Sequence, residues 1–550
     1  MSETSHLRDF TLDRRVLILS GMAVIIGACG AGLAVILLKL IGLMTNIFYF
    51  HRFAFGMVSP AGSPLGKMIV FVPIVGGLLV GLMARYGSDK IRGHGIPEAM
   101  EAILLNGAKV QPRLAVLKPI SAAIAIGSGG PFGAEGPIIM TGGAVGSLLA
   151  QGLHLSDNER TVLLVAGAAA GMSATFAAPF AAVLLAVELL LFEWRPRSLI
   201  PVAVASITAG LLRMFWLGTG PVFPSTALNF SWDGRHTVIA LVLGLLVGLA
   251  AAVLSRMVYG CEDLFEHLPL HWAWWPAIGG LGVGIGGLIF PHALGVGYDM
   301  IALLLTGHAA LGILLGVLLV KSAIWVFALG SGTSGGVLAP LLMIGGAMGA
   351  MFARLMHSGP EETAIWALIG MGSMLAGSLG APLTAIVFSL ELTHQFECVP
   401  LLVVGCVAAY GLTAFIMPRS ILTEKLGRRG LHLSREYGID PLEMLMVSKV
   451  MRAEPPASTR YSVYSDEPCR IAAERMARKE VMELAVRDRA TRQVLGTVAL
   501  KDLLHGRKLA FNREENRTRV LGLRLLRRSE PDEEDGDELV AAGSKTSLAE

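Results

Sequence analysis

Two glycine-rich segments contain the residues of this sequence that are best suited to bind a small charged species. The first, residues 127–150, reads GSGGPFGAEGPIIMTGGAVGSLLA, and the second, residues 330–353, reads GSGTSGGVLAPLLMIGGAMGAMFA. In each segment a glycine cluster leads to a proline and an apolar stretch, and proline suits the first turn of a helix. Free backbone N–H groups and the positive end of the helix dipole make such a helix start a site for an anion. The sequence therefore predicts two helix N-termini that together hold a small halide.

Glu135 lies inside the first glycine cluster. An ionisable side chain at membrane depth costs roughly 2.5–3.5 kcal/mol on insertion scales, so its presence points to a function. A deprotonated Glu135 can occupy an anion site itself, and a protonated Glu135 can leave it, so we predict that this residue is a gate. The alternative is that the glycines only allow helices to pack closely, as small residues often do in membranes.

The composition indicates that these segments lie in a lipid bilayer. Hydrophobic residues make up 53% of the 550 residues and charged residues 16%, whereas soluble domains carry about 25% charged residues. Apolar runs recur from residues 16–43 to 401–417, and about 20 residues are needed to cross the hydrocarbon core. Shorter stretches interrupted by Gly and Pro, such as 119–126 and 137–149, are interpreted as half-spanning or broken helices. We therefore predict an all-α polytopic membrane protein.

The first apolar run is expected to be a retained transmembrane helix. Arg8, Arg14 and Arg15 precede it, as basic residues precede the core of a signal peptide. The run continues for about 28 residues, however, beyond the usual 7–15 residues of a signal-peptide core. Residues 1–14 are predicted to be a cytoplasmic N-terminus.

An internal repeat divides the membrane part into two related halves. The glycine-rich segments are displaced by 330 − 127 = 203 residues, and the same displacement places Ala178-Pro179 on Ala381-Pro382 and Glu188 on Glu391. The halves extend over about 15–217 and 237–417. Such halves are either parallel or inverted, and the sequence alone leaves both open. Glu188 and Glu391 are interpreted as structural residues that accept hydrogen bonds from backbone amides or a neighbouring polar group.

The chain beyond Pro418 is predicted to form a small cytoplasmic α/β appendage. Residues 482–487 and 494–500 have the alternation of short strands beside helices, and residues 419–528 are dense in Lys and Arg. The positive-inside rule places such a segment in the cytoplasm, and we place both termini there. Residues 527–550 are too polar to fold by apolar burial, and we expect a disordered acidic tail.

Several other functions find little support. The five cysteines show no paired spacing and no Cys/His zinc pattern, so we expect no metal and no cofactor. No P-loop that would mark an ATP-driven pump is present. An intramembrane hydrolase using Ser331 or Ser334 is a remote alternative, because a serine nucleophile needs an oriented base and no histidine follows at a suggestive position. We expect no enzymatic activity and no nucleic-acid partner.

Three motifs identify a family that this chain resembles. Residues 93–98 read GHGIPE, residues 133–137 read GAEGP and residues 336–340 read GVLAP. In this order and spread they resemble the CLC family of chloride channels and chloride/proton antiporters, of the bacterial type, over about residues 15–430. The resemblance implies inverted repeats with broken and re-entrant helices, a cell-membrane location, and a homodimer with one anion pathway per subunit.

The resemblance also assigns roles to individual residues. Glu135 matches the gating glutamate of the family. Five residues fall where the family coordinates the anion through backbone amides: Gly133, Ala134, Val337, Leu338 and Ala339.

Two positions depart from the usual family pattern. A serine that coordinates the anion in the first motif is here His94, whose imidazole donates one hydrogen bond when neutral and adds charge when protonated. Alternatively, His94 merely packs at a helix start. A tyrosine at the inner gate is replaced by Leu422 within SILTEKL, and an apolar residue cannot coordinate an anion, so the inner gate is looser or hydrophobic.

Proton coupling depends on how the segment after Pro179 is aligned. Counting from Pro179 places Leu189 at the position of the internal proton acceptor, which favours channel-like passive conduction of chloride. Counting back from Arg195-Pro196 gives Glu193, four residues after Leu189 and hence on the same helical face. Glu193 is then either a substitute proton acceptor, which would make the protein a coupled chloride/proton antiporter, or an interfacial charge paired with arginine. We favour the second interpretation.

Residues 440–510 resemble half of a CBS pair, the regulatory modules that many CLC proteins carry. Only one copy is evident in the sequence, which argues against nucleotide binding. The expected partners are therefore a small anion, most simply chloride, membrane lipid, a second copy of the chain and, for an antiporter, protons.

Overall fold

Residues 14–224, 233–431, 440–456, 458 and 460–508 are described by the computed structural model. The chain divides into a large helical unit, Met1–Arg435, and a smaller unit, Glu436–Glu550. The predicted acidic tail at 527–550 and all but the last residue of the predicted N-terminal segment 1–14 lie outside the described residues.

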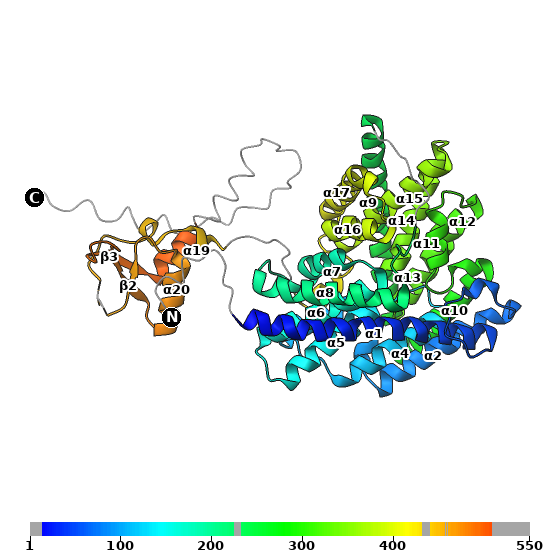
Figure 1. Ribbon diagram of the computed structural model, residues 1–550, viewed down its shortest axis with the longest axis horizontal. Coiled ribbons are helices and arrows are strands. Elements are labelled where there is room, and N and C mark those ends of the chain that lie inside the picture. Colours follow the sequence, from blue (N-terminus) through cyan, green and yellow to red (C-terminus); the bar gives the residue numbers. More distant parts are fainter. Residues whose placement is uncertain (1–13, 225–232, 432–439, 457, 459, 509–550) are drawn as a thin grey trace, which may run out of the picture. The chain divides into compact units, whose positions relative to one another are not determined.

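Eight helices form the first repeat of the large unit (Figure 1). They are α1 (Arg15–Phe50), α2 (Phe71–Tyr86), α3 (Ile96–Leu105), α4 (Pro112–Gly127), α5 (Glu135–Gly152), α6 (Asp157–Phe176), α7 (Pro179–Leu185) and α8 (Pro196–Leu217). The last turn of α7 continues as a π-helical turn over Ala186–Leu191. The long α1 packs against α6 and α8.

The second repeat follows the same order. Its helices are α9 (Gly234–Glu266), α10 (Trp275–Ile289), α11 (Tyr298–Leu304), α12 (Leu311–Leu315), α13 (Ser322–Gly330), α14 (Leu338–Leu355), α15 (Pro360–Leu379), α16 (Pro382–Thr393) and α17 (Val399–Ile416), and the short α18 (Glu424–Arg428) ends the unit. A π-helical turn, Gly316–Lys321, joins α12 to α13.

The helix starts reproduce the repeat found in the sequence. The first residues of α5, α6, α7 and α8 and those of α14, α15, α16 and α17 differ by 338 − 135, 360 − 157, 382 − 179 and 399 − 196, each 203. Proline lies in the first turn of every one of these helices except α6, so the same local signal begins most of the equivalent helices in both halves.

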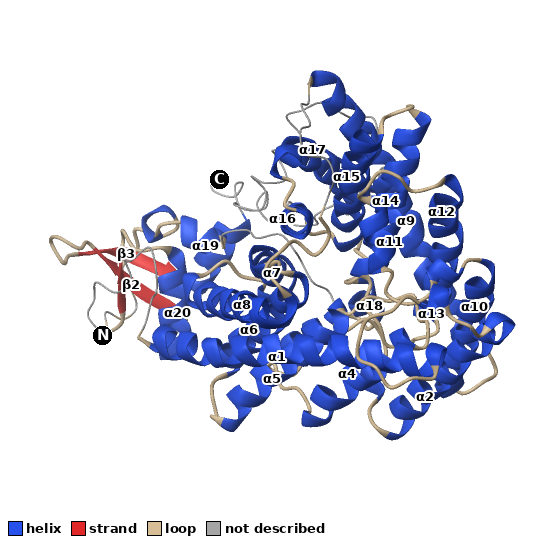
Figure 2. Cartoon of the chain, turned by 45° about the vertical axis from the view of Figure 1, so that its right-hand side comes forward, coloured by secondary structure: helices blue, strands red, loops and turns tan. Residues whose placement is uncertain are grey.

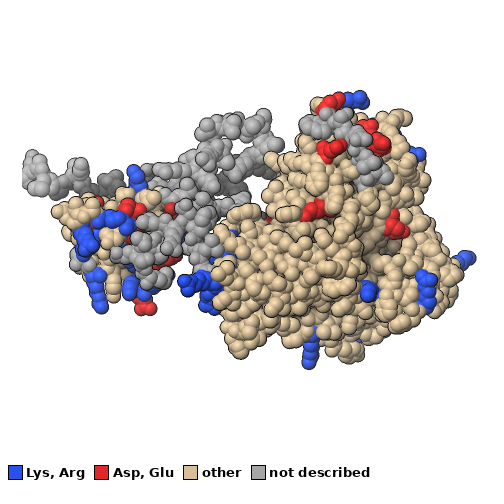
Figure 3. Space-filling view, viewed as in Figure 1, with Lys and Arg blue, Asp and Glu red and all other residues tan. Residues whose placement is uncertain are grey.

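The predicted fold class is confirmed. Among the described residues, nine helices are long and apolar enough to cross a membrane, and shorter apolar helices accompany them. The surface of the helical unit in Figure 3 shows wide areas without Lys, Arg, Asp or Glu. Strands are confined to the small C-terminal unit within the described part of the chain (Figure 2).

Glycines allow α5 and α6 to approach closely, and their equivalents do the same for α14 and α15. A Cβ added at Gly142 would lie 2.2 Å from the carbonyl oxygen of Gly167, and one at Gly345 would lie 2.4 Å from that of Gly370. For these glycines the packing interpretation is therefore correct, because only the absence of a side chain lets the backbones meet.

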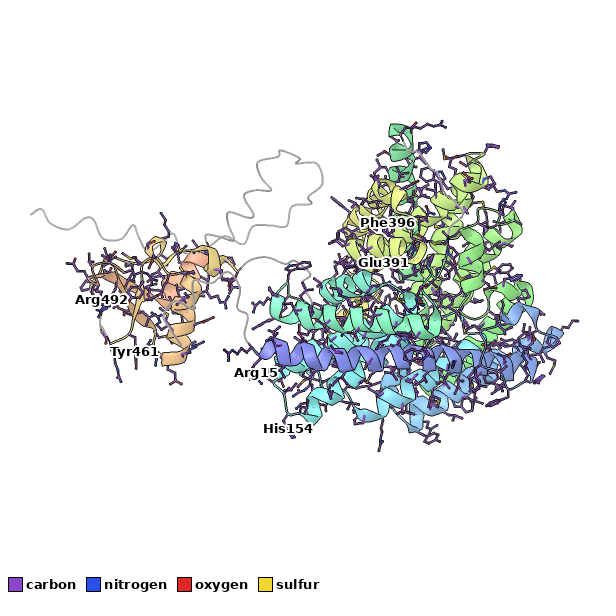
Figure 4. All side chains as sticks on the ribbon, in the orientation of Figure 1. Arg15, His154, Glu391, Phe396, Tyr461 and Arg492 are labelled. Carbon is purple, nitrogen blue, oxygen red and sulfur yellow. The ribbon has the colours of Figure 1, made fainter. Side chains whose placement is uncertain are left out.

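The two repeats cap each other's helices. The carboxylate of Glu391 in α16 accepts hydrogen bonds from the N–H groups of Phe180 (3.0 Å) and Ala181 (2.8 Å) at the start of α7. The carboxylate of Glu188 in turn accepts from the N–H groups of Leu383 (3.2 Å) and Thr384 (2.8 Å) at the start of α16. Glu391, labelled in Figure 4, lies where α16 meets α7. Both glutamates are thus structural, as expected, and each replaces water that a membrane interior does not supply.

The C-terminal unit is a small α/β module. It contains α19 (Pro441–Met444), β1 (Ser462–Tyr464), α20 (Cys469–Lys479), β2 (Glu483–Arg487) and β3 (Val494–Ala499). Strand β2 lies in the centre, parallel to β1 and antiparallel to β3. The predicted strands at 482–487 and 494–500 correspond to β2 and β3. The resemblance to half of a CBS pair stays a prediction.

We expect Glu391→Ala to destabilise the helical unit by about 1–2 kcal/mol, because two N–H groups of α7 lose their acceptor. The midpoint of thermal unfolding in detergent should fall accordingly. The control is Glu397→Ala, since Glu397 is an exposed carboxylate that follows α16 in the sequence. Equal midpoints for the two variants would contradict the capping role.

Candidate functional site

The two glycine-rich loops meet in the interior of the helical unit and deliver two helix N-termini to one point. The N–H of Gly336 donates to the carbonyl of Gly133 (2.9 Å), and the N–H of Gly133 donates to the carbonyl of Gly336 (3.2 Å). Helices α5 and α14 begin two residues after these glycines. Loops that lie 203 residues apart in the sequence therefore form one structure, and their antiparallel pairing fits repeats of opposite orientation.

Neither of these N-termini is capped by a side chain. The N-cap residue of α5 is Ala134 and that of α14 is Val337, and neither side chain can accept a hydrogen bond. The first N–H groups of a helix have no intrahelical acceptor, so they stay available to a ligand. Two uncapped termini with their positive dipole ends directed at one point attract negative charge.

The Glu135 carboxylate fills this point. Glu135 is the first residue of α5 and is fully buried. Its Oε2 atom would lie 1.7 Å from a Cβ added at Gly133 and 2.7 Å from a Cβ added at Gly336, so glycine is needed on both sides. The carboxylate is directed at the N–H groups of Glu135 itself and Ala339, yet neither oxygen reaches hydrogen-bonding geometry. A negative charge is thus held loosely between the two helix starts.

The five predicted amides do not all have the expected role. Ala134, Val337, Leu338 and Ala339 lie at the uncapped starts of α5 and α14, where the first N–H groups have no intrahelical acceptor, and their role in anion binding stays a prediction. Gly133 differs from the expectation, because its N–H donates to the Gly336 carbonyl and so joins the two loops.

His94 lies at the beginning of α3, beside the first turn of α5. Its carbonyl oxygen would be 1.6 Å from a Cβ added at Gly136, so the His94 backbone packs directly on α5. The imidazole is buried, and its Nδ1 atom has no hydrogen-bonding partner in the described structure. Whether the imidazole binds an anion or only packs at the helix start stays a prediction.

Glu98 and Lys425 neutralise the start of α3. Glu98 accepts a hydrogen bond from the N–H of Gly95 (2.7 Å) through one oxygen and from Lys425 Nζ (2.6 Å) through the other. The N-terminus of α3 is therefore already occupied by a carboxylate.

Sequence reasoning missed two buried lysines near the loops. Lys118 Nζ donates to the carbonyls of Ile91 and Gly93 (both 2.8 Å). Lys321 Nζ donates to the carbonyls of Ala293 (2.8 Å) and Gly295 (2.7 Å). Both side chains are fully buried. They differ by 321 − 118 = 203, so the internal repeat could have identified them, and each holds the loop before α3 or α11.

At the position expected to be the inner gate, Leu422 is fully buried in the turn before α18. The neighbouring N–H of Ile421 donates to the carbonyl of Ser378 (3.1 Å), and the Tyr259 hydroxyl donates to the Ile421 carbonyl. Tyr259 therefore brings a phenol close to this position, but its hydrogen is already donated to the backbone.

The segment at Leu189 and Glu193 departs from one prediction. Leu189 is fully buried, but it lies in the π-helical turn, and Phe192 has a left-handed backbone (φ 52°) that ends the helix. Glu193 consequently does not lie one turn further on the same helical face, and that prediction is wrong. The change of winding and the left-handed residue redirect the chain before Glu193.

Glu193 instead belongs to a cluster at a half-exposed position. Its carboxylate forms ion pairs with Arg195 (3.4 Å) and Arg197 (3.5 Å) and accepts a hydrogen bond from the Ser198 hydroxyl. This arrangement is that of an interfacial charge paired with arginine.

The serines of the second loop are engaged by other hydroxyls. Ser331 Oγ donates to the carbonyl of Ala328 (2.6 Å) and contacts Thr333 Oγ1 (2.9 Å). Ser334 Oγ lies 3.3 Å from Ser121 Oγ. In the described structure neither serine is hydrogen-bonded to a histidine, so the geometry gives the hydrolase alternative no support.

Comparisons with known proteins agree with this geometry. Residues 76–414 match the family model of the voltage gated chloride channel. A ClcB-like chloride channel protein from Ralstonia nicotianae is 30% identical over 363 residues, which cover 64% of this chain and 84% of that protein.

Two solved structures have a similar fold. A slow cyanobacterial Cl⁻/H⁺ antiporter aligns with a TM-score of 0.65 and 23% identity over 76% of this chain and 99% of that chain. A CLC-type fluoride/proton antiporter aligns with a TM-score of 0.64 and 21% identity over 75% of this chain and 98% of that chain.

We expect His94→Ala to weaken chloride binding by about two- to tenfold, the range for loss of one neutral hydrogen bond. His94→Ser should weaken chloride binding less than His94→Ala, because the serine hydroxyl is still a hydrogen-bond donor. Isothermal titration calorimetry in detergent measures both. His292→Ala is the matched control, since His292 also has a buried Nδ1 without a partner in the described structure but belongs to the turn Pro291–Ala293 and not to the motif before α3. Unchanged binding in both His94 variants would show that the imidazole does not bind the anion.

Proposed function

This chain belongs to the voltage-gated chloride channel family and is a membrane protein that transports small anions, and on that premise we propose that it conducts chloride passively, with Glu135 as the gate. The observation that carries the proposal is the position of the Glu135 carboxylate. It lies buried between the uncapped N-termini of α5 and α14, without a hydrogen-bonding partner in the described structure.

The gate works by competition for the same backbone dipoles. An ionised Glu135 places its own negative charge where an anion would be stabilised, so it excludes the anion. Protonation removes that charge, and the neutral side chain then gains little from the two helix dipoles. A chloride ion takes its place, stabilised by the N–H groups at the starts of α5 and α14.

Passive conduction is supported by the absence of a carboxylate at the expected proton-acceptor position. Leu189 there is apolar and fully buried. Glu193 is held by two arginines and a serine hydroxyl at a half-exposed position. Leu189 has no titratable group, and the Glu193 carboxylate is already engaged in ion pairs, so neither residue is a free proton acceptor of the kind that a coupled cycle needs.

A coupled chloride/proton antiporter is the second candidate. The similar solved structures carry the names of Cl⁻/H⁺ and fluoride/proton antiporters, which favours coupling. In that mechanism Glu193 would be the internal proton acceptor and would have to leave its ion pairs in each cycle.

The proposed setting follows from the family and from the charge distribution. We place the protein in the cell membrane with both termini in the cytoplasm, as a homodimer with one pathway per subunit and no catalytic activity. The chain leaves the helical unit just after α18, so Lys425 and Leu422 then lie on the cytoplasmic side of the pathway.

Replacing Glu135 by Gln should abolish most of the pH dependence of chloride flux. The amide is nearly isosteric with the protonated acid and carries no charge at any pH, whereas gating by one carboxylate changes flux by up to roughly tenfold per pH unit. Chloride efflux from proteoliposomes at a series of pH values measures this. Glu397→Gln, an exposed carboxylate, is the control. A steep rise in Glu135→Gln flux on acidification would refute the gate.

Glu193→Gln should leave both chloride flux and its pH response unchanged, because the carboxylate takes no part in passive conduction. The measurement is chloride efflux with simultaneous recording of pH outside the vesicles. In an antiporter, a chloride gradient would drive uphill proton movement in the parent protein and not in the variant, since an amide cannot exchange a proton near neutral pH. Such a difference between the two proteins would contradict passive conduction and support the antiporter mechanism.

A further inference from the structure

Arg92 lines a large cavity that opens beside the loop before α3. The cavity has a volume of about 780 Å³. Besides Arg92, its walls include Gly93, Glu98, Trp272, Trp275, Glu262 and Lys425. Arg92 lies two residues before His94 and directly precedes the GHGIPE motif. The cavity thus lies beside the loop that carries His94 and is also lined by residues of α18.

The Arg92 guanidinium is held rigidly by aromatic rings. Its central carbon lies 4.8 Å from the centroid of the Trp272 ring and 5.5 Å from that of Trp275. Cation–π contacts of this kind keep the positive charge in place without neutralising it. On another side, Nη2 would be 2.6 Å from a Cβ added at Gly332, a glycine with a positive φ of 75° in the second glycine-rich loop. Arg92 therefore lies where the loop before α3 meets the second glycine-rich loop.

The guanidinium also has unused hydrogen-bonding capacity. Nε is buried and has no hydrogen-bonding partner, and within the described residues Arg92 forms no ion pair. Three other cations around the cavity are paired instead, Lys425 with Glu98, Arg429 with Glu101 and Arg428 with Asp263. A planar guanidinium offers five donors and normally uses them on carboxylates or other anions.

Carboxylates do face this group, but at a distance. Asp89, Glu262 and Glu266 act electrostatically on Arg92, and none of them forms an ion pair with it. They weaken the local field without occupying the donors. A site of this kind favours a small monovalent anion that is held briefly, rather than a multivalent one held tightly.

We propose that Arg92 binds a small monovalent anion at the wall of this cavity and passes it to His94 and the two helix N-termini. The inference deepens the proposed function and rests on it. It also supplies what the sequence lacks, since the two hydroxyls that the family resemblance leads one to expect are replaced by His94 and Leu422. The charged donor that attracts the anion lies just outside the motif, where the fold fixes it between two tryptophans.

The test compares Arg92→Gln with Lys90→Gln. Lys90 lines the same cavity and loses the same charge, but its side chain is exposed and no hydrogen bond or ion pair of it is seen in the described structure. Currents are recorded from the full-length protein in planar lipid bilayers, with chloride varied on one side at a time and then replaced by nitrate.

Arg92→Gln should raise the half-saturating chloride concentration by about three- to tenfold on one side of the bilayer only, with the maximal current retained. Lys90→Gln should shift it by less than about twofold, because a solvated charge is screened. Arg92→Lys should fall between the parent and Arg92→Gln, since it keeps the charge and loses the planar fork. The shift should also be seen with nitrate.

Three outcomes would overturn the inference. Equal shifts for Arg92→Gln and Lys90→Gln would assign the effect to the general field of the cavity. A loss of maximal current on both sides, or a loss of thermal stability that Glu262→Gln restores, would make Arg92 a structural partner of Glu262. Parent-like half-saturation in both Arg92 variants would show that no anion binds there. Failure of the proposed function is distinguishable, since the parent and Glu135→Gln would then carry no anion-selective current in the same bilayers.

Discussion

A helix that begins inside a membrane must find partners for its first N–H groups without help from water, and this constraint organises the structure. Helices α5 and α14 begin in the interior, and their N-cap residues have no side chain that can accept a hydrogen bond. The loops before them pair with each other through Gly133 and Gly336, which brings two positive helix ends to one point. That point requires a negative group. The protein supplies one in Glu135, and a small anion of similar charge is the natural substitute for it.

At other helix starts and loops, the buried backbone groups have fixed hydrogen-bonding partners. The starts of α7 and α16 are each capped by a glutamate of the other repeat, Glu391 or Glu188. The loops before α3 and α11 are held by the ammonium groups of Lys118 and Lys321, each bonded to two carbonyls. These fixed partners make a rigid frame. Within it, Glu135 is distinguished because both of its oxygens lack a hydrogen-bonding partner among the described residues.

Charge on the α18 side of the pathway is arranged on a similar principle. Lys425 is committed to Glu98, and the Tyr259 hydroxyl is committed to the backbone beside Leu422. Groups that are already hydrogen-bonded in this way have few N–H or O–H donors left for an ion. Arg92, held by stacking between Trp272 and Trp275 rather than by a carboxylate, keeps its donors and its charge. Aromatic contacts can thus position a cation in a membrane protein and leave its capacity to bind an anion intact.

The sequence by itself determined the class of protein, the repeat of 203 residues, the paired glycine-rich helix starts and the presence of a carboxylate, Glu135, at one of them. These features follow from local signals, since glycine, proline and hydropathy act on the few residues around them. Only the tertiary structure decided which polar groups meet. Gly133 turned out to join the loops, Glu193 lies beyond a π-helical turn among arginines, and the roles of Lys118, Lys321 and Arg92 became visible. The physical reason is that such partnerships join residues far apart in the chain or depend on how a turn is wound, and neither is encoded in a short stretch of sequence.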